Sequence, residues 1–289
     1  MISDITLGQF FPGESIIHRL DPRTKILMAT AFIVAVFLAN NPAAFLFITL
    51  TTVSLVLISG ISGRTILKSI KPIVIILIFT ALINVFLTVG EGEPLVAFWV
   101  IEIYTKGIVR AIFMALRVVL LVVGTSVLLT YTTSPISLTD GIESLLKPLK
   151  LIKVPVHLFA MMMTIALRFI PTLVEETEKI MNAQKSRGAD FTSGGIVKRA
   201  KALIPILIPL FVSSFKRAEE LATAMECRCY RGDVKRTKLV KLTFRFKDYA
   251  MLFASLIFLG ALITARILPY EFDVASVIYK VFFYKIGEQ

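Results

Sequence analysis

Residues 72–90 read PIVIILIFTALINVFLTVG and contain no charged side chain. A helix needs about 20 mostly apolar residues to cross the hydrocarbon core of a bilayer, so this stretch is long enough to span one. Four further runs are also mostly apolar and are candidate spans: Ile26–Ala39, which a snorkelling Lys25 would extend, Ala43–Ile61, Ile108–Tyr131 and Tyr249–Ala265. The sequence therefore predicts an all-α polytopic membrane protein with about five transmembrane helices.

The composition supports a membrane protein. Apolar residues make up 56% of the 289 residues, and the mean hydropathy is +0.80, whereas soluble domains contain about 45–50% apolar residues. The net charge of +12 does not indicate nucleic-acid binding, because the cations lie between apolar segments and not on one face of a soluble domain. Residues 1–24 lack the pattern of a cleavable signal peptide, so we expect the first span to serve as the insertion signal.

The charges of the loops predict the orientation of the chain. Loops 40–42 and 91–104 contain no Lys or Arg, whereas the segments before the first span and after the second are basic. The basic residues of these two segments are Arg19, Arg23, Arg64, Lys68 and Lys71. Basic loops stay in the cytoplasm, so we expect a multi-pass protein of the cell (inner) membrane with its N-terminus inside.

Residues 134–247 carry 20 Lys and Arg against 10 Asp and Glu, a net charge of +10. We therefore expect three parts: a tail with four spans (1–133), a cytoplasmic region (134–247), and the last span with a tail (248–289). The middle part is predicted to form three amphipathic helices, at about 138–149, 156–186 and 196–227, with kinks at Pro171, Pro205 and Pro209. The alternative is seven spans, with Val156–Ala166 and Leu203–Phe215 crossing, but it would place a basic loop outside.

A ten-residue pattern, Glu-x-apolar-x-x-Ala-x-x-x-Arg, occurs twice in this basic region. The copies run from Glu178 to Arg187 and from Glu219 to Arg228, so the arginines are 41 positions apart. Each arginine is predicted to end a helix, with Ser186 and Gly188 beside the first and Cys227 and Cys229 beside the second. The five donors of a guanidinium can grip carboxylates or carbonyls in the groove of a partner. The alternative is an interaction with the helix's own negative end, but the repetition favours two matched partner sites.

The sequence predicts no catalytic, cofactor-binding or metal site. No Gly-x-x-x-x-Gly-Lys-Ser/Thr is present, so we do not expect ATP hydrolysis by this chain. His18 and His157 have no acid, nucleophile or second ligand nearby in the sequence, and two cysteines alone are weak evidence for a metal. The carboxylates of Glu175, Glu176 and Glu178 are interpreted as a solvated helix face.

Two further groups of residues allow more than one interpretation. Arg110 and Arg117 lie on one face of the fourth span, where a charged side chain is costly. They either contact protein or water, or they snorkel to the membrane surface. Snorkelling fits Lys106 best. In a self-contained permease, the two arginines would line the substrate pathway. Met161, Met162 and Met163 form either an adaptable partner surface or ordinary helix packing.

Several short motifs together resemble one family. They are Gly13-Glu14-Ser15, His18–Lys25 (HRLDPRTK), Thr132–Pro135 (TTSP), Ala166–Pro171 (ALRFIP) and the two arginine tips, Ser186-Arg187-Gly188 and Cys227-Arg228-Cys229. With these motifs the chain resembles the transmembrane T component of energy-coupling factor transporters, the ATP-driven importers of vitamins and of cobalt or nickel ions.

The resemblance implies a non-catalytic scaffold that joins two soluble ABC-type ATPase subunits to an exchangeable, substrate-binding membrane subunit. Arg187 and Arg228 would then insert into grooves on the ATPases. Asp21, Arg23, Arg117 and Arg168, with the three methionines, are candidates for structural or subunit contacts, although Asp21 and Pro22 also suit the N-terminal cap of the first helix. A membrane enzyme acting on lipid or polyprenyl substrates is a further alternative, but no acidic metal motif supports it.

Overall fold

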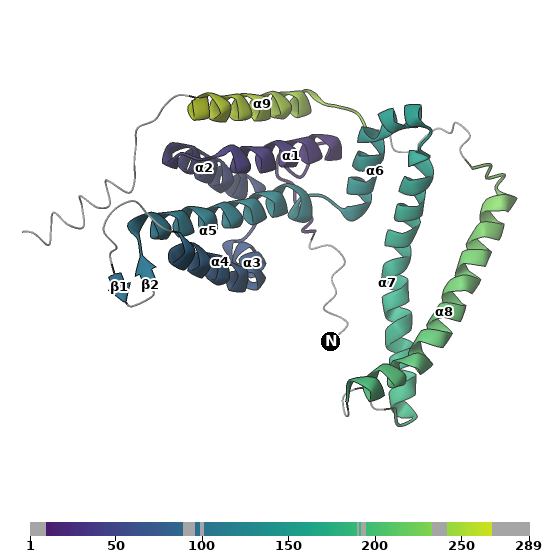
Figure 1. Cartoon of the computed structure of the whole chain (residues 1–289). Coiled ribbons are helices and arrows are strands. Elements are labelled where there is room, and N and C mark those ends of the chain that lie inside the picture. Colours follow the sequence, from purple (N-terminus) through teal and green to yellow (C-terminus); the bar gives the residue numbers. More distant parts are fainter. Residues whose placement is uncertain are drawn as a thin grey trace, which may run out of the picture. The chain divides into compact units, whose positions relative to one another are not determined.

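The computed structural model describes residues 10–88, 96–98, 101–189, 191, 195–232 and 242–267. The described residues are nearly all helical and divide into two compact units. One unit contains residues 10–134 and 242–267, and the other contains the helices of residues 135–232 (Figure 1). The predictions made for residues 1–9, for most of the loop after residue 88, for residues 233–241 and for the tail after residue 267 lie outside the described residues.

The first unit is a layer of apolar helices. Its elements are α1 (Pro22–Leu38), α2 (Pro42–Ser59), α3 (Gly63–Ile70), the 3₁₀ turn η1 (Lys71–Ile73), α4 (Val74–Leu87), α5 (Thr105–Thr125), the π-helical turn η2 (Ser126–Tyr131) and α9 (Phe246–Ile267). Two short strands, β1 (Val96–Phe98) and β2 (Ile101–Ile103), pair antiparallel with Val96 opposite Ile103. These strands lie in the loop 91–104 between the third and fourth predicted spans, and the other regular elements of the described chain are helical, as predicted.

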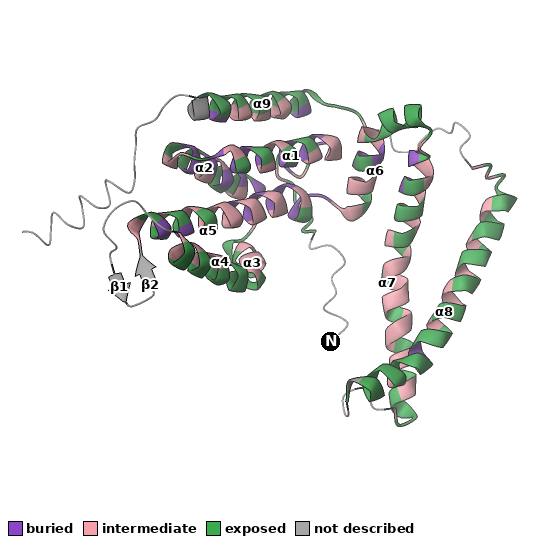
Figure 2. Cartoon of the chain, in the orientation of Figure 1, coloured by how far each residue is buried: buried purple, intermediate pink, exposed green. Residues whose placement is uncertain are grey.

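Helix α1 lies at the centre of this unit and packs against α2, α5 and α9 (Figure 2). Its inward residues form the largest part of the core: Met28, Ala29, Phe32, Ala35, Val36 and Ala39. Gly124 of α5 lets the two helices approach, because a Cβ at this position would lie 2.2 Å from the ring of Phe32. The outer faces of α2, α4 and α9 stay exposed, as is expected where lipid is the solvent.

Among the described residues, five helices are long and apolar enough to cross a membrane. They are Pro42–Ser59, Gly63–Leu87, Thr105–Tyr131, Val156–Ser186 and Phe246–Thr264. The number of candidate spans agrees with the prediction, but they are not the same five helices. Helix α1 has 17 residues and spans about 25 Å, short of the hydrocarbon thickness of about 30 Å. The helix at 156–186 qualifies instead, although its sequence was assigned to the cytoplasmic region, and that assignment stays a prediction.

The second unit contains α6 (Pro135–Leu145), the 3₁₀ turn η3 (Lys147–Ile152), α7 (Val156–Ser186) and α8 (Ile196–Cys227). Helices α7 and α8 match the predicted boundaries. Helix α6 begins and ends earlier than expected, because Pro135 favours a helix start and Pro148 disfavours the α conformation at the residue before it. In Figure 1, α8 begins near the C-terminal end of α7, runs in the opposite direction and diverges from it.

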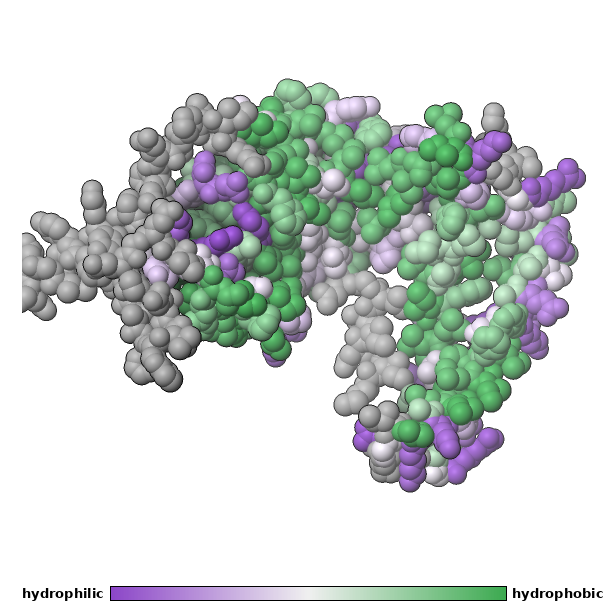
Figure 3. All heavy atoms as spheres, viewed as in Figure 1, coloured by the Kyte–Doolittle hydropathy of each residue, from purple (hydrophilic) through white to green (hydrophobic). Residues whose placement is uncertain are grey.

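Few side chains are buried within the second unit. Its buried apolar side chains among the described residues are those of Val156, Ala160 and Ile206. The three prolines that were expected to kink these helices, Pro171, Pro205 and Pro209, lie inside α7 and α8. Apolar side chains of α8 such as Phe211 and Phe215 are more than 60% exposed, and Figure 3 shows apolar atoms over the middle of the α7–α8 pair. This unit therefore presents an apolar surface that its own chain does not cover within the described residues.

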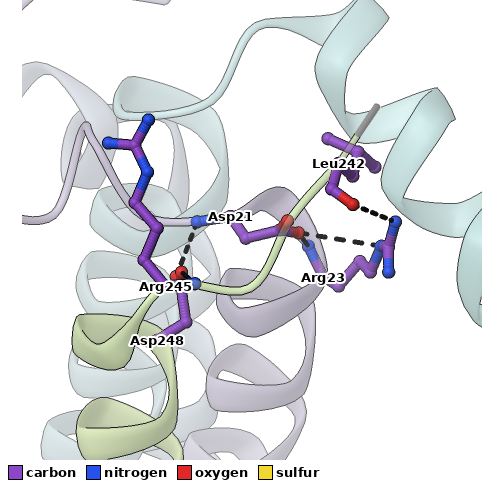
Figure 4. A network of polar contacts seen from close by, with 5 residues as sticks. All are labelled: Asp21, Arg23, Leu242, Arg245 and Asp248. Atoms are coloured by element: carbon purple, nitrogen blue, oxygen red, sulfur yellow. Dashed lines mark hydrogen bonds and ion pairs between the residues drawn. The ribbon is translucent and has the colours of Figure 1, made fainter. Parts of the chain in front are cut away.

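A buried carboxylate joins the N-terminal ends of α1 and α9 (Figure 4). Asp248 accepts a hydrogen bond from the backbone N–H of Asp21 at 2.8 Å and a second from that of Arg245 at 2.8 Å. Asp21 in turn caps α1 by accepting from the N–H of Arg23 at 2.9 Å, as expected for Asp followed by Pro. The guanidinium of Arg23 donates to the carbonyl of Leu242 at 3.3 Å.

Lys25 does not snorkel as expected. Its side chain is buried, and its ammonium donates to the carbonyl oxygens of Thr132 at 2.7 Å and of His18 at 3.1 Å. The acceptors come from the end of η2 and from the segment before α1. The snorkelling prediction was wrong because these carbonyl groups satisfy the ammonium inside the unit, where a buried charge needs hydrogen-bonding partners.

Replacing Asp248 with Asn should destabilise the first unit by about 1–3 kcal/mol, because one buried N–H would then face an amide NH₂ instead of an acceptor. Thermal unfolding of the detergent-solubilised protein would show this as a lower midpoint. Glu14→Gln is the matched control, since Glu14 forms an exposed ion pair with Arg19 and should leave the midpoint nearly unchanged. Equal midpoints for the Asp248→Asn variant and the unmodified chain would contradict the prediction.

Candidate functional site

The helices α7 and α8 end in the same hydrogen-bonded turn. After α7, the N–H of Gly188 donates to Lys185 O at 2.9 Å and the N–H of Ala189 donates to Gln184 O at 3.0 Å. This pair of bonds is a Schellman motif, in which the residue after the C-cap adopts a left-handed conformation. Gly188 has φ of 86°, which glycine adopts at little cost.

The second tip repeats this geometry without glycine. The N–H of Cys229 donates to Glu226 O at 2.8 Å, and the N–H of Tyr230 donates to Met225 O at 3.0 Å. Cys229 has φ of 56°, a conformation that costs a residue other than glycine about 1–2 kcal/mol. The chain therefore forms the same cap at both tips, at an energetic cost at the second.

The shared cap places an arginine at the C-cap position of each helix. Arg187 has φ of −89° and Arg228 has φ of −90°, so the two C-cap residues have the same backbone φ. Both side chains are exposed, and within the described ranges neither guanidinium forms a hydrogen bond or ion pair. No bond to the carbonyls of their own helices occupies them, which weakens the alternative of a purely local interaction.

The neighbours of the arginines are also at the surface. Ser186 donates to Asn182 O at 3.1 Å, and Cys227 and Cys229 are exposed and are not joined in a disulfide. Among the described residues, no group of three or more His, Cys, Asp or Glu side chains is arranged to hold a metal ion. The geometry of the tips therefore offers donors to a partner and no coordination chemistry.

An ion pair connects α7 to α8. Arg217 and Glu176 lie 3.1 Å apart and are each about one-third exposed. They are separated by 41 positions, the spacing of the repeat, and each lies two positions before the start of a copy. The interpretation of the glutamates as a solvated face was therefore wrong for Glu176, whose partner is on the other helix, while Glu175 is exposed as expected.

Both histidines have partners that the sequence did not predict. His157 Nδ1 lies 3.1 Å from the buried carboxyl group of Glu143, which joins α6 to α7. His18 Nδ1 lies 2.6 Å from the hydroxyl of Ser15, and its Nε2 lies 3.1 Å from Phe11 O. Burial lowers the pKa of His18, a nearby backbone acceptor raises it, and the charge of Lys25 lowers it.

These histidine contacts are structural. The expectation that the histidines lack nearby partners was wrong, because a short-range bond and a bond between two helices supply them. Neither contact combines a nucleophile, a base and an orienting acid, so no catalytic arrangement results. Gly13 leaves the space that the ring of His18 occupies, since a Cβ there would lie 2.8 Å from the ring.

The arginines of the membrane helices are placed differently from each other. Arg117 donates to Ala39 O at 2.6 Å and lies over the ring of Phe45, 5.4 Å from its centroid. Ala39 is the C-cap of α1, so Arg117 binds the negative end of another helix. Arg110 is exposed and has no partner within the described ranges, and Lys106 is exposed as well.

The remaining candidates are at the surface of α7. Arg168 is exposed without a hydrogen-bond or ion-pair partner in the described chain. Met161 is half-buried, whereas Met162 and Met163 are each 52% exposed. Asp248, which the sequence did not single out, and Lys25, which was expected to snorkel, hold the first unit together. Their only signal was a charged residue at the start of an apolar run, because their partners are 227 and 107 positions away.

Residues 13–240 match the sequence model of the family CbiQ, described as cobalt transport protein. An energy-coupling factor transporter transmembrane protein EcfT from Clostridium kluyveri is 51% identical over 267 residues, which cover 92% of this chain and 98% of the relative. The chain belongs to the energy-coupling factor transporter transmembrane protein family. Relatives with the same description include one from Acidaminococcus fermentans, 55% identical over 86% of this chain and 91% of its own length, and one from Bacillus subtilis, 48% identical over 91% and 98%.

Membership of this family confirms the resemblance inferred from the motifs. The chain is a multi-pass membrane protein and a subunit of a transporter of the energy-coupling factor type. Both arginine tips lie inside the matched range of residues 13–240.

Substitutions at position 229 should change the stability of the second tip. Cys229→Gly should stabilise the cap by about 1 kcal/mol because the left-handed conformation then carries no side-chain penalty, and Cys229→Val should weaken it. Hydrogen exchange of the Tyr230 amide reports this directly, slowing in the first variant and accelerating in the second. Gly188→Ala is the matched change at the first tip and should accelerate exchange of the Ala189 amide. Unchanged exchange in all three variants would show that the caps do not limit opening.

Proposed function

We propose that this chain is the scaffold and coupling subunit of an ATP-driven importer of vitamins or transition-metal ions. It links two cytoplasmic ABC-type ATPases to a substrate-binding membrane subunit. The observation that carries the proposal is the pair of arginine tips, which share one cap geometry and leave both guanidinium groups without a partner in the described chain. Two equivalent tips are suited to two equivalent partners.

The chemistry of the tips fits docking into a groove of a soluble protein. A guanidinium presents a rigid fork of donors that matches carboxylates and clustered carbonyl groups, and it loses little freedom when it binds. The Schellman cap satisfies the last backbone carbonyls of each helix, so a partner needs to pair only with the side chain. Both tips would lie in the cytoplasm, in agreement with the net charge of +10 on residues 134–247.

The second unit is built to transmit movement between its ends. Arg217–Glu176 braces α7 against α8, and His157–Glu143 braces α6 against α7. The C-terminal ends of α7 and α8 lie far apart in Figure 1, so a displacement of one tip relative to the other would change the angle between these long helices. The substrate-binding subunit would contact the exposed apolar surface, in which Met162 and Met163 can repack.

The rival proposal is a self-contained permease with Arg110 and Arg117 along its pathway. The contacts of Arg117 disfavour this rival, because its guanidinium donates a hydrogen bond to the carbonyl of Ala39 and lies over the ring of Phe45. A permease would bind substrate without other subunits. Saturable binding of a vitamin or metal ion by the purified chain alone would favour the rival.

The double variant Arg187→Ala/Arg228→Ala tests the coupling role. It should reduce recovery of the ATPases with the purified complex at least about 10-fold, because truncating one side of a charged hydrogen-bonded contact costs about 2–5 kcal/mol per site. Uptake should fall in parallel, while the amount of protein inserted in the membrane stays the same. Arg187→Lys/Arg228→Lys should give an intermediate loss, since lysine keeps the charge but not the fork.

Arg64→Ala/Arg199→Ala is the matched control, because it removes two exposed arginines outside the tips. It should leave ATPase recovery and uptake unchanged. Normal uptake and normal recovery in the Arg187→Ala/Arg228→Ala variant would refute the proposed role of the tips.

A further inference from the structure

A cavity of about 380 Å³ opens where the segment before α1 meets the start of α9. Both parts belong to the first unit. Its wall includes three basic residues, Arg19, Arg245 and Lys247, and two acidic residues, Glu14 and Asp248. Neither the ion pairs of α6–α8 nor the arginine tips contribute to it.

The acidic groups of the wall are already paired. Both oxygens of Asp248 accept hydrogen bonds from backbone N–H groups, those of Asp21 and Arg245. Glu14 pairs with Arg19 at 3.0 Å. The side chains of Arg245 and Lys247 are exposed and have no hydrogen bond or ion pair within the described ranges. Figure 4 shows the guanidinium of Arg245 extending away from the carboxylate of Asp248 while only the backbone nitrogen contacts it. The three cations and two carboxylates of the wall leave a net charge of +1, and Arg245 and Lys247 are the cations without an ion-pair partner within the described ranges.

The start of α9 adds to the positive potential. Arg245 precedes the first turn, so the N–H groups of Phe246 and Lys247 have no acceptor within the helix. The 22 residues of α9 give this end a partial positive charge. Anions bind at such ends when side-chain cations lie beside them, as Arg245 and Lys247 do here.

The surroundings of the cavity are those of a membrane surface. Phe246 is 87% exposed and Tyr249 is 62% exposed, and both lie at the start of a helix that is apolar enough to cross a membrane. Aromatic side chains at the end of a membrane helix anchor at the level of the lipid headgroups. Ile16, 55% exposed, adds an apolar side chain to the wall of the cavity.

We propose that this cavity binds the phosphate group of an anionic phospholipid, with Arg245 and Lys247 as its principal ligands. Basic pockets beside membrane helices recognise such headgroups through their excess charge. The exposed rings of Phe246 and Tyr249 would contact the glycerol and upper acyl region of the same lipid. The site does not depend on the coupling role proposed for the arginine tips.

The segment that carries Arg245 is fixed before any lipid arrives. Arg23 holds Leu242 through its carbonyl group and lies 5.2 Å from the centroid of the Phe244 ring. Asp248 holds the N–H of Arg245 from the other side. Binding therefore needs only the side chains of Arg245 and Lys247 to become ordered, which lowers its entropic cost.

The test measures binding of phosphatidylglycerol to the full chain in phosphatidylcholine nanodiscs by native mass spectrometry. Arg245→Gln/Lys247→Gln should bind phosphatidylglycerol about 30-fold more weakly, because each basic side chain at a membrane surface contributes a factor of about five. The exchanged variant Arg245→Lys/Lys247→Arg keeps both charges and should retain binding. An unchanged thermal midpoint in phosphatidylcholine alone would show that the variants are folded.

The matched control is Arg64→Gln/Lys68→Gln, which removes two exposed cations of α3 and should leave the affinity unchanged. A second arm adds inorganic phosphate, which should not displace phosphatidylglycerol if the lipid is the true ligand. Equal affinity in the Arg245→Gln/Lys247→Gln variant, an equal loss in the control, or displacement by inorganic phosphate would each overturn the proposal.

Discussion

The first unit depends on the polar contacts at the N-terminal end of α1. Asp21 caps this helix, Asp248 joins it to α9, and Lys25 joins it to the end of η2 and to the segment before it. All three side chains are buried, and each has hydrogen-bonding partners that offset the loss of water. Because lipid does not drive apolar helices together as water does, such specific contacts and close packing have to set the arrangement of the helices.

The second unit has less internal packing than the first. It buries few side chains within the described residues, and its helices are held to one another by the pairs Arg217–Glu176 and His157–Glu143. A partly exposed pair such as Arg217–Glu176 contributes little stability, so the angle between α7 and α8 should be easier to change than the packing around α1. That difference suits the coupling role that we propose for the second unit.

Unpaired cations mark both proposed interaction sites, but their surroundings separate the two. Arg187 and Arg228 project from capped helix ends with small or polar neighbours, which suits a groove in a soluble protein. Arg245 and Lys247 stand beside exposed aromatic rings at the start of an apolar helix, which suits a lipid headgroup. Charge alone does not distinguish these partners, whereas the side chains around the charge do.

The sequence by itself determined the helical class, the approximate spans and the two arginine tips, because apolar runs and local repeats are properties of neighbouring residues. It also predicted the bounds of α7 and α8. Only the tertiary structure decided that Cys229 adopts the conformation of Gly188, that Lys25 is buried and does not snorkel, and that His157 and Glu176 have acidic or basic partners. The contacts of Asp21 with Asp248 and of Arg117 with Ala39 join residues 227 and 78 positions apart. A pattern within one segment carries no information about such partners, because the packing of separate helices chooses them.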